Sequence, residues 1–519
     1  MPPAATSALA AASTVEDTLP SVESAIDRVF QPVTEALSSI IFFDVTIAGA
    51  DFPLIVGWLV LAGIILTVYF GFIQVRGLKV ASQVVRGKFS RSSDPGEVTH
   101  FQALTSAVSG TVGLGNIAGV AVAVTVGGPG ATFWMICCGL LGMATKFTEC
   151  TLGVKYREVH DDGTVTGGPF RYLKVAFDKV RISWLGTLLT AVFAIAIFFF
   201  GLAGGNMFQA NQTFAQARNV TGGADGPLGS ATAAFVFGLV LAALVGLVIL
   251  GGISSIGKVT SKLVPAMAGV YVLACLVVIL SNVSLVPGAV GEIITGAFAP
   301  EGVAGGVLGA LIVGFQRAAF SNEAGVGSAA IAHSAAKTRR PVSEGFVGLL
   351  EPFIDTVVIC TMTALTIVIS RPDSWLAARE EVAATGSTTA DGVVLTSDAF
   401  AGVVPWFPVV LAVAVALFAF STLITWSYYS LKAWSHFFGR SKVSELTFKV
   451  LYCLFTVVGT VLTFGQVLNL ADAMLFVCAL INIIGLYILM PVVKQELREY
   501  LADRRSGKLA HEAAEVPAG

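Results

Sequence analysis

The chain has little charge for its length. Asp, Glu, Lys and Arg make up 12% of its 519 residues, about half the fraction that is usual in soluble globular proteins. The hydrophobic fraction is 55%, and the mean hydropathy is +0.82. Apolar runs of about 20 residues recur along the sequence, each long enough to cross the hydrocarbon core of a bilayer. This composition excludes a soluble domain and predicts an all-α polytopic membrane protein.

Residues that carry enzyme and metal chemistry are also scarce. There are 5 His and 7 Cys, and every Cys lies in an apolar run without the spacing of a metal site. The carboxylates inside the spans have no His or Cys partner at useful spacing, so we do not expect an enzyme or an organic cofactor. No Lys or Arg precedes Arg28, so the N-terminus lacks the basic region of a signal peptide. We expect a disordered tail over 1–22 and an amphipathic surface helix over 23–43.

The apolar runs predict 11 transmembrane helices. Their expected bounds are 53–73, 103–127, 129–153, 183–214, 230–251, 254–282, 305–336, 343–370, 403–436, 445–466 and 468–493. Counted by connection, 26 Lys and Arg fall on one side of the membrane and 4 on the other, and Arg317 remains inside the seventh span. Positive charge marks the cytoplasmic side. The sequence therefore predicts an outer N-terminus and a cytoplasmic C-terminus.

Two glycine-rich stretches recur at matched positions. Gly113-Leu114-Gly115-Asn116-Ile117-Ala118 and Gly325-Val326-Gly327-Ser328-Ala329-Ala330 share one pattern and are 212 residues apart. Pro129 and Pro341 follow them at the same separation. Interrupted helices in corresponding positions of two halves are the best sequence indicator of the central site of a transporter.

The two stretches open two groups of five spans. Because five is odd, the second group runs opposite to the first, which predicts a 5+5 inverted repeat, leucine-transporter-like, preceded by one extra helix. The expected divisions are an outer tail over 1–50, the extra helix and a cytoplasmic loop over 51–100, the repeats over 101–282 and 283–495, and a cytoplasmic tail over 496–519.

A break in a membrane helix can bind ligands through its backbone. Unwound carbonyls can bind a cation, and the N–H groups that start the next half-helix can hold a carboxylate. Residues 109–116 supply these groups, and Asn116 adds a side-chain oxygen. Two other interpretations stay open for such glycines: close helix packing and, with no strand before them, a weaker dinucleotide-binding motif.

The seventh span carries Arg317 and Glu323, and ionisable groups inside a membrane are functional by default. We expect a gating role, with direct substrate contact and proton transfer by Glu323 as alternatives.

Lys146 and Glu149 near the end of the third span are expected to snorkel to the cytoplasmic surface. Glu351 and Asp355, four residues apart, suggest a polar seam. The hydroxyls of Ser421 and Thr422 are suitable ligands for Na⁺, although such hydroxyls often donate hydrogen bonds to carbonyls of their own helix.

The sequence resembles the alanine/glycine:cation symporter family over about residues 50–500. The resemblance is carried by these blocks: Ser109-Gly110-Thr111-Val112-Gly113 through Asn116-Ile117-Ala118-Gly119-Val120-Ala121, Gly127-Gly128-Pro129-Gly130-Ala131, Gly142-Met143-Ala144-Thr145-Lys146-Phe147-Thr148-Glu149, Asn206-Met207-Phe208-Gln209-Ala210-Asn211, residues 317–327, and Phe418-Ala419-Phe420-Ser421-Thr422 with Trp426-Ser427-Tyr428-Tyr429. It implies the leucine-transporter fold.

The resemblance also implies site residues. The substrate would contact Gly113, Leu114, Gly115, Gln209, Phe315 and Trp426. One Na⁺ would lie between the carbonyls of Ser109 and Val112 and the hydroxyls of Ser421 and Thr422. A second Na⁺ would use the carbonyl of Thr111 and the side chain of Asn116. This chain departs from the family pattern at Leu114, where a threonine is common, at Thr425 and Ser430, at Leu349-Leu350-Glu351-Pro352, and in the insert 371–402.

The resemblance implies Na⁺-coupled symport of a small neutral amino acid, alanine or glycine, into the cell by alternating access. It places the chain in the inner membrane of a bacterium or archaeon. We expect a monomer, with the amino acid, Na⁺ and the lipid bilayer as partners and no nucleic acid. The alternatives are an H⁺-coupled symporter that uses Glu323, and a non-transporting sensor or channel on the same fold.

Overall fold

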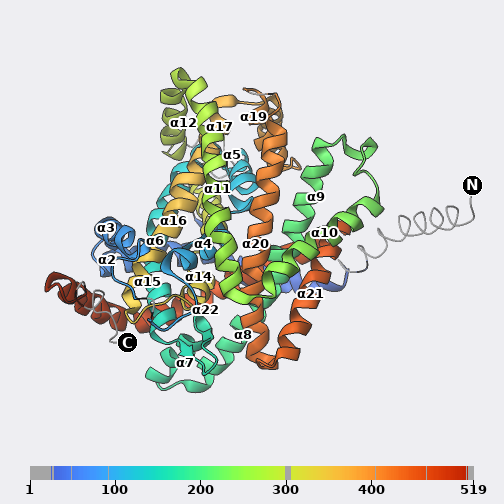
Figure 1. Cartoon of the computed structure of the whole chain (residues 1–519). Coiled ribbons are helices and arrows are strands. Elements are labelled where there is room, and N and C mark those ends of the chain that lie inside the picture. The colour runs from blue at the N-terminus through green and yellow to red at the C-terminus, as the bar shows by residue number, and fades with distance from the viewer. Residues whose placement is uncertain are drawn as a thin grey trace, which may run out of the picture.

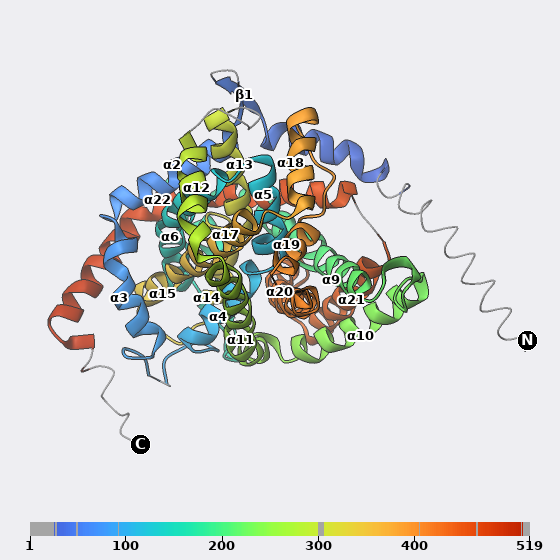
Figure 2. The ribbon, with the colours of Figure 1, turned by 90° about the horizontal axis from the view of Figure 1, so that it is seen from above.

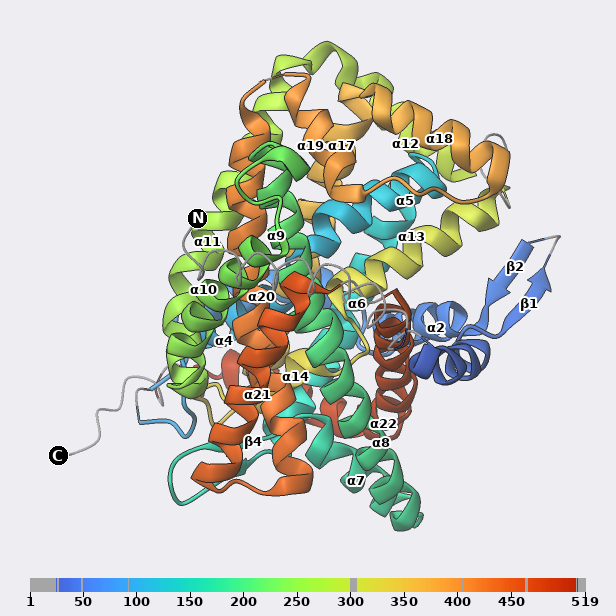
Figure 3. The same cartoon turned by 90° about the vertical axis from the view of Figure 1, so that its right-hand side faces the viewer.

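The computed structural model describes residues 25, 28–47, 50–91, 93–298, 306–403, 405–462, 465–509 and 511. The expected tail over 1–22 lies outside them. A helix covers residues 28–41, within the expected surface helix over 23–43. Two short antiparallel hairpins, β1 (Asp44–Ile47) with β2 (Ala50–Pro53) and β3 (Glu158–Val159) with β4 (Val165–Thr166), are the strands of the described residues. Figure 3 shows the β1–β2 hairpin standing away from the helices.

Helices joined by turns and loops form the rest of the described structure. Those of the first half are α2 (Leu54–Tyr69), α3 (Ile73–Val85), α4 (His100–Thr111), η1 (Gly115–Gly119), α5 (Val120–Val126), α6 (Ala131–Lys155), α7 (Pro169–Lys179), α8 (Ser183–Leu202), η2 (Ala203–Met207), α9 (Phe208–Val220), η3 (Gly223–Asp225), α10 (Ala231–Ile249) and α11 (Gly252–Ser281). Here η1 and η2 are π-helical turns, and η3 is a 3₁₀ turn.

Those of the second half are η4 (Val283–Leu285), α12 (Val286–Phe298), α13 (Gly306–Asn322), α14 (Ser328–His333), α15 (Pro341–Gly348), α16 (Leu350–Pro352), η5 (Phe353–Cys360), α17 (Thr361–Ser370), α18 (Asp373–Thr385), α19 (Gly392–Ala401), α20 (Phe407–Phe438), α21 (Lys442–Val461) and α22 (Gly465–Arg505). Again η5 is π-helical. Figure 2 looks down on the bundle and shows α13 and α17 beside α5.

The helices are long and apolar enough for a multi-pass membrane protein. Within the described residues, 8 helices pass a test of length and hydropathy for a membrane span, and two bent pairs raise the number to 10. One pair is α2 with α3, bent by 75°, and the other is α4 with residues 115–126, bent by 55°. The seventh expected span contains α13, whose 17 residues end at a break. The count of 11 and the 5+5 arrangement remain predictions.

Several expected loops contain helices. The loop 74–100 begins with α3, the segment 146–181 contains α7, and the insert 371–402 forms α18 and α19. Each of these helices has 10 to 13 residues, too few to span a bilayer. In α3 and α7 one face is buried, with Val80 and Leu173 as examples. A search for runs of about 20 apolar residues misses such helices.

The basic connections lie together on one side of the bundle, as their alternation predicts. Arg157 donates to the carbonyls of Pro95, Ser334, Ala336 and Thr338, at 2.6 to 2.7 Å. The sparsely charged connections lie at the other end, where Figure 1 shows α12, α17 and α19 opposite α7. The contacts of Arg157 bring together the basic segments that follow the first, third and seventh expected spans, and the side that faces the cytoplasm remains a prediction.

Candidate functional site

The first glycine stretch breaks a helix. Helix α4 begins with a capping box, in which the Thr99 hydroxyl and the Gln102 side chain each accept from the other residue's backbone N–H. It ends at Thr111, and Val112 takes an extended conformation with φ −76° and ψ 98°. The chain then resumes as the π-helical turn η1 and helix α5. Residues 112–114 therefore separate two half-helices, as the sequence predicts.

Asn116 fixes the geometry of this break. The N–H of Gly113 donates to Asn116 Oδ1 at 2.8 Å, and Asn116 Nδ2 donates to Asp355 Oδ1 at 2.6 Å. The other oxygen of Asp355 accepts from the hydroxyls of Ser321 and Thr356 at 2.9 and 2.7 Å. Asp355, on η5, thus joins the first break to the end of α13. The Asn116 oxygen proposed for a second Na⁺ would have to share this hydrogen bond.

Helix α20 contacts the end of α4 through hydroxyl groups. The Thr422 hydroxyl lies 3.1 Å from the carbonyl oxygen of Ser109, and the Ser109 hydroxyl donates to the carbonyl of Ser421 at 2.6 Å. The Ser421 hydroxyl donates to the carbonyl of Phe418, in its own helix, at 2.8 Å. Trp426 Nε1 donates to the carbonyl of Gly110 at 3.2 Å. Ser109, Ser421 and Thr422, expected as Na⁺ ligands from segments over 300 residues apart, therefore meet.

A small cavity of about 30 Å³ lies against this break. It is lined by Gly110, Thr111, Gly113, Leu114, Gly115, Phe200, Gly204, Gln209, Phe320, Glu323, Thr422 and Trp426. Five of the six expected substrate residues are among them. Gln209 Nε2 donates to the carbonyl of Gly204 at 3.1 Å. Gln209 Oε1 is buried beside the cavity and accepts no hydrogen bond from the described residues.

Phe315, the sixth expected residue, does not line the cavity. Its ring lies 6.4 Å from that of Trp134, centroid to centroid, and its carbonyl accepts from the thiol of Cys138. Because α13 stays helical to Asn322, positions five apart point about 140° away from each other. Phe320 therefore faces the cavity, while Phe315 packs against α6. The aromatic wall is formed by Phe200, Phe320 and Trp426.

The second glycine stretch breaks the chain between α13 and α14 in a different way. Glu323, Gly325 and Gly327 have positive φ angles of 53°, 98° and 89°. Glu149 Oε1 accepts from the N–H of Gly325 at 2.6 Å, and Asn482 Nδ2 donates to the carbonyl of Gly325 at 2.8 Å. Glu149 and Asn482 therefore replace the helical hydrogen bonds that the break removes.

The matched glycines have different roles. Neither Gly113 nor Gly115 has a positive φ, and a Cβ on Gly113 would lie 3.0 Å from Thr422 Oγ1. The first pair thus permits close approach of α20, whereas the second pair permits left-handed backbone. The two glycine stretches therefore share a sequence pattern but differ in backbone conformation.

The two charged residues of the seventh span, Arg317 and Glu323, contact different parts of the structure. Glu323 lines the cavity and accepts from the hydroxyl of Ser328. Arg317 lies one to two turns earlier in α13, is partly exposed, and is close enough to Asp472 on α22 to act on it electrostatically. The two residues therefore do not pair with each other, and only Glu323 reaches the cavity.

The expectation that Lys146 and Glu149 snorkel is wrong. Both side chains are fully buried, and Lys146 Nζ lies 3.0 Å from Glu351 Oε1. The tight packing of α6 against α13, α14 and α15 holds them inside the bundle. Their carboxylate and ammonium groups find partners there instead of at the surface.

The sequence places no His at useful spacing from the intramembrane carboxylates, but the fold brings two His to one of them. Glu344, fully buried, contacts the Nδ1 atoms of both His100 and His333. His333 Nε2 lies 4.0 Å from Glu351 Oε2. A continuous buried row of ionisable groups therefore runs from α4 to Lys146. This row of contacts could not be read from the sequence, because His100 and Glu344 are 244 residues apart.

The insert 371–402 reaches the first break. The Thr396 hydroxyl, on α19, donates to the carbonyl of Ile117 at 3.1 Å. A Cβ on Gly392 would lie 2.4 Å from the carbonyl oxygen of Ala118. Helix α19 therefore packs directly on η1, with a glycine at the closest contact.

Gly205 sets the position of Trp426, and replacing it should disrupt the cavity. A Cβ at this position would lie 2.4 Å from Trp426 Cγ and 2.7 Å from Trp426 Cβ. We expect Gly205→Ala to displace the indole, break its hydrogen bond to Gly110, and destabilise the protein by about 1–3 kcal/mol. Uptake by the variant in proteoliposomes should fall at least about tenfold, since a misplacement of 1 Å can have such an effect.

The matched control for Gly205→Ala is Gly269→Ala in α11. A Cβ there meets nothing within 4 Å, and alanine favours a helix by about 1 kcal/mol over glycine. Uptake by this variant should equal that of the wild type. Equal uptake by the two variants would show that the Gly205–Trp426 contact does not shape the site.

A polytopic helical bundle with two broken helices and a small cavity against the first break is typical of a membrane transporter. Residues 36–514 match the sodium:alanine symporter family, and the chain belongs to that family. It is therefore a symporter and not an enzyme.

Named relatives agree with this membership. The chain is 37% identical over 445 residues to the sodium/alanine symporter AgcS of Methanococcus maripaludis, covering 86% of this chain and 93% of that one. It is 33% identical to the probable sodium/glutamine symporter GlnT of Bacillus subtilis, covering 86% and 87%. Among solved structures, that of MhsT in complex with L-phenylalanine aligns with a TM-score of 0.47 at 14% identity, over 76% of this chain and 88% of that one.

Proposed function

We propose that this protein imports a small neutral amino acid, alanine or glycine, together with Na⁺. The observation that carries the proposal is the meeting of the broken first helix with α20 beside a small buried cavity. Carbonyl and hydroxyl oxygens from Ser109 and Thr422 lie 3.1 Å apart there. Hard oxygen ligands of this kind suit Na⁺, and the backbone break supplies them without a buried charge.

The proposed substrate site uses the same cavity. The carboxylate would bind the backbone at Gly113, Leu114 and Gly115, where a half-helix begins. Gln209 Oε1, a buried acceptor with no partner among the described residues, would receive the ammonium group. A volume of about 30 Å³ and the rings of Phe200, Phe320 and Trp426 favour a small side chain. The Methanococcus relative, a sodium/alanine symporter, supports alanine, and GlnT, a probable sodium/glutamine symporter, suggests a larger alternative.

The proposed Na⁺ site is formed by the carbonyls of Ser109 and Val112 with the hydroxyls of Ser421 and Thr422. A second ion at Thr111 and Asn116 would compete with the hydrogen bond from Gly113 to Asn116 Oδ1. We propose that Na⁺ orders the first break, that substrate completes the site, and that the two broken helices then rock against the other helices. Contacts between their ends support such a unit, since the N–H of Lys337 donates to the carbonyl of Val98 at 2.8 Å.

The topology is part of the proposal. Eleven spans, with a 5+5 inverted repeat after the first, place the N-terminus outside and the C-terminus in the cytoplasm of a bacterium or archaeon. The gathering of the basic segments on one side of the bundle supports this orientation. We propose that the monomer is the transporting unit, because both broken helices and α20 come from one chain.

Substrate competition in proteoliposomes tests the proposal. Uptake of labelled L-alanine would be measured with glycine, D-alanine, L-serine or L-glutamine as competitors, each with and without a Na⁺ gradient. We expect glycine and alanine to compete and glutamine to have little effect. Strong inhibition by glutamine with weak inhibition by glycine would contradict the assignment of a small substrate.

Proton coupling through Glu323 is a second candidate, because this carboxylate lines the cavity. If protons drive transport, a pH gradient alone will support uptake and Glu323→Gln will abolish that uptake. On the Na⁺-coupled account, Glu323→Gln retains Na⁺-driven uptake, although its hydrogen bond with Ser328 is weakened. Comparing the two gradients in wild-type and Glu323→Gln vesicles separates the two mechanisms.

A further inference from the structure

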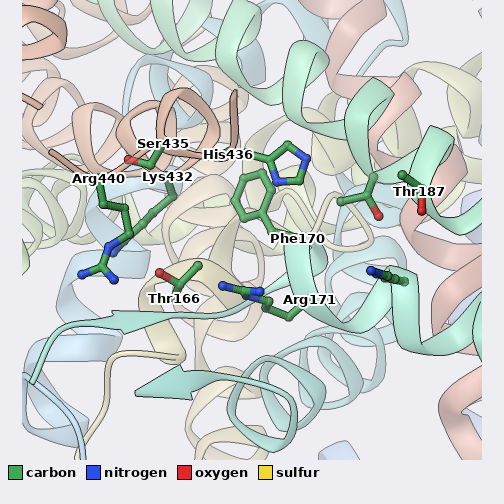
Figure 4. A pocket seen from close by; sticks show the side chains of 10 residues that line it. Thr166, Phe170, Arg171, Thr187, Lys432, Ser435, His436 and Arg440 are labelled. Carbon is green, nitrogen blue, oxygen red and sulfur yellow. The ribbon is translucent and has the colours of Figure 1, made fainter. Parts of the chain in front are cut away.

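A second cavity, of about 330 Å³, lies away from the broken helices. It is lined by Thr166, Phe170, Arg171, Lys174, Thr187, Thr190, Lys432, Ser435, His436 and Arg440. These residues come from β4, α7, α8, the end of α20 and the turn after it. Figure 4 shows Arg171 opposite Lys432 and Arg440, with the ring of Phe170 beside that of His436. The cavity shares no residue with the proposed substrate site.

The lining is basic. It contains Arg171, Lys174, Lys432 and Arg440, with His436 as a fifth nitrogen base, and it contains no Asp or Glu. The Phe170 and His436 rings stack at 6.1 Å with an interplanar angle of 28°. The Thr187, Thr190 and Ser435 hydroxyls donate to carbonyls of their own helices. The cationic groups are therefore the donors that the cavity offers to a ligand.

Carboxylates outside the lining balance only part of this charge. Glu158 pairs with Arg171, and Asp162 lies 3.2 Å from Arg440. Glu97 acts electrostatically on Lys432, which donates to the carbonyl of Val165 at 2.7 Å. Burial raises the pKa of the Glu97 carboxyl, and the charge of Lys432 opposes this effect.

One cation of the lining has no neighbouring carboxylate among these three. Lys174 is exposed and forms no ion pair with the described residues. The four Lys and Arg side chains of the lining thus have three neighbouring carboxylates, and a monoanion would neutralise the one positive charge in excess. Guanidinium groups bind phosphate oxygens through two parallel N–H donors, and lysine adds a point charge.

The surroundings indicate that the anion is part of a lipid. Trp184 and Phe438, next to the cavity along α8 and α20, are 70% and 62% exposed, and Leu188 and Phe437 are also exposed. Tryptophan gathers at the level of membrane headgroups, and exposed apolar side chains beside it would contact acyl chains. Basic pockets between membrane helices on the cytoplasmic side bind anionic headgroups.

We propose that this cavity binds the phosphate group of an anionic phospholipid such as phosphatidylglycerol. The phosphodiester would lie between Arg171 and Lys174 on one side and Lys432 and Arg440 on the other. The bound headgroup would hold α7 and α8 against the end of α20. This inference does not depend on which amino acid or ion the protein transports.

Thermal unfolding of the full chain in detergent tests the proposal, with native mass spectrometry to count retained lipids. The probes are dioleoyl phosphatidylglycerol, dioleoyl phosphatidylcholine and inorganic phosphate. The test variants are Arg171→Gln/Lys174→Gln and, from the opposite wall, Arg440→Gln. The control, Lys258→Gln/Lys262→Gln, removes two exposed charges from α11 on the same side of the bundle.

We expect phosphatidylglycerol to stabilise the wild type and the control more than phosphatidylcholine does. The double variant in α7 should need at least about tenfold more phosphatidylglycerol for the same shift, with Arg440→Gln intermediate. Inorganic phosphate should have little effect. Stabilisation by phosphate alone, lost in the double variant, would overturn the lipid as the source of the anion. Equal shifts with the two lipids, or an unchanged shift in the double variant, would overturn the site itself.

Discussion

Replacing both hydroxyls at the proposed Na⁺ site, Ser421→Ala/Thr422→Ala, should abolish Na⁺-driven uptake at physiological Na⁺. The Thr422 hydroxyl lies 3.1 Å from the Ser109 carbonyl oxygen, so its loss removes a ligand at the point where α20 contacts the break. If each lost ligand costs about 1.4 kcal/mol, the affinity for Na⁺ falls about a hundredfold. The measurement is the Na⁺ concentration for half-maximal alanine uptake in proteoliposomes.

Ser427→Ala is the matched control for this double variant. Ser427 is buried on the same helix, and its hydroxyl donates to the carbonyl of Ile424 in its own helix at 2.6 Å. Its removal should leave the dependence on Na⁺ unchanged. An unaltered Na⁺ dependence in Ser421→Ala/Thr422→Ala would show that the ion binds elsewhere.

Replacing Lys146 with methionine should have the largest effect on stability. Lys146 and Glu351 are both fully buried, with 3.0 Å between Nζ and Oε1. Removal of one partner leaves an uncompensated buried charge and costs about 3–5 kcal/mol. We expect Lys146→Met to lower the midpoint of thermal unfolding by several degrees and to reduce the yield of folded protein.

Two further variants test the physical reason for this loss. The pair Lys146→Met/Glu351→Gln should recover part of the stability, because it removes the Glu351 charge together with its partner and leaves the charges of Glu149 and Glu323 near Lys146 in place. Lys155→Met removes one partner of the exposed pair with Glu496, which lies at 2.6 Å, and such surface pairs contribute about 0–1 kcal/mol. Equal destabilisation by Lys146→Met and Lys155→Met would contradict the account of the buried pair.

The long helices and their breaks could be predicted from the sequence. Long apolar segments indicate the membrane-spanning helices, and the matched glycine stretches indicate where two of these helices are interrupted. The approach of Ser109 to Ser421 and Thr422 came from family resemblance, because contacts across 312 residues have no local signal. The bounds of α3, α7 and α12 could not be predicted from apolar length, since these helices are too short to span the bilayer.

The buried polar contacts were harder to predict. An intramembrane carboxylate must find partners, which could have marked Asp355 and Glu149 as structural centres. Nothing in the sequence shows that Asp355 contacts Asn116 or that Glu149 contacts Gly325. The expected substrate contact of Phe315 came from the family resemblance and stays a prediction, although Phe315 does not line the cavity. Helix α13 continues to Asn322 and turns Phe320 toward the cavity instead.

The most direct test of the central claim measures both fluxes at once. Purified protein in proteoliposomes would receive labelled L-alanine and labelled Na⁺, with an inward Na⁺ gradient or an equal K⁺ gradient. The account predicts that alanine accumulates above its external concentration only with Na⁺, and that alanine increases Na⁺ entry. It also predicts that both effects are lost in Ser421→Ala/Thr422→Ala. Na⁺-coupled symport would be contradicted by equal alanine uptake with the K⁺ gradient, or by alanine that equilibrates without accumulating. A rate of Na⁺ entry that is the same with and without alanine would also contradict it.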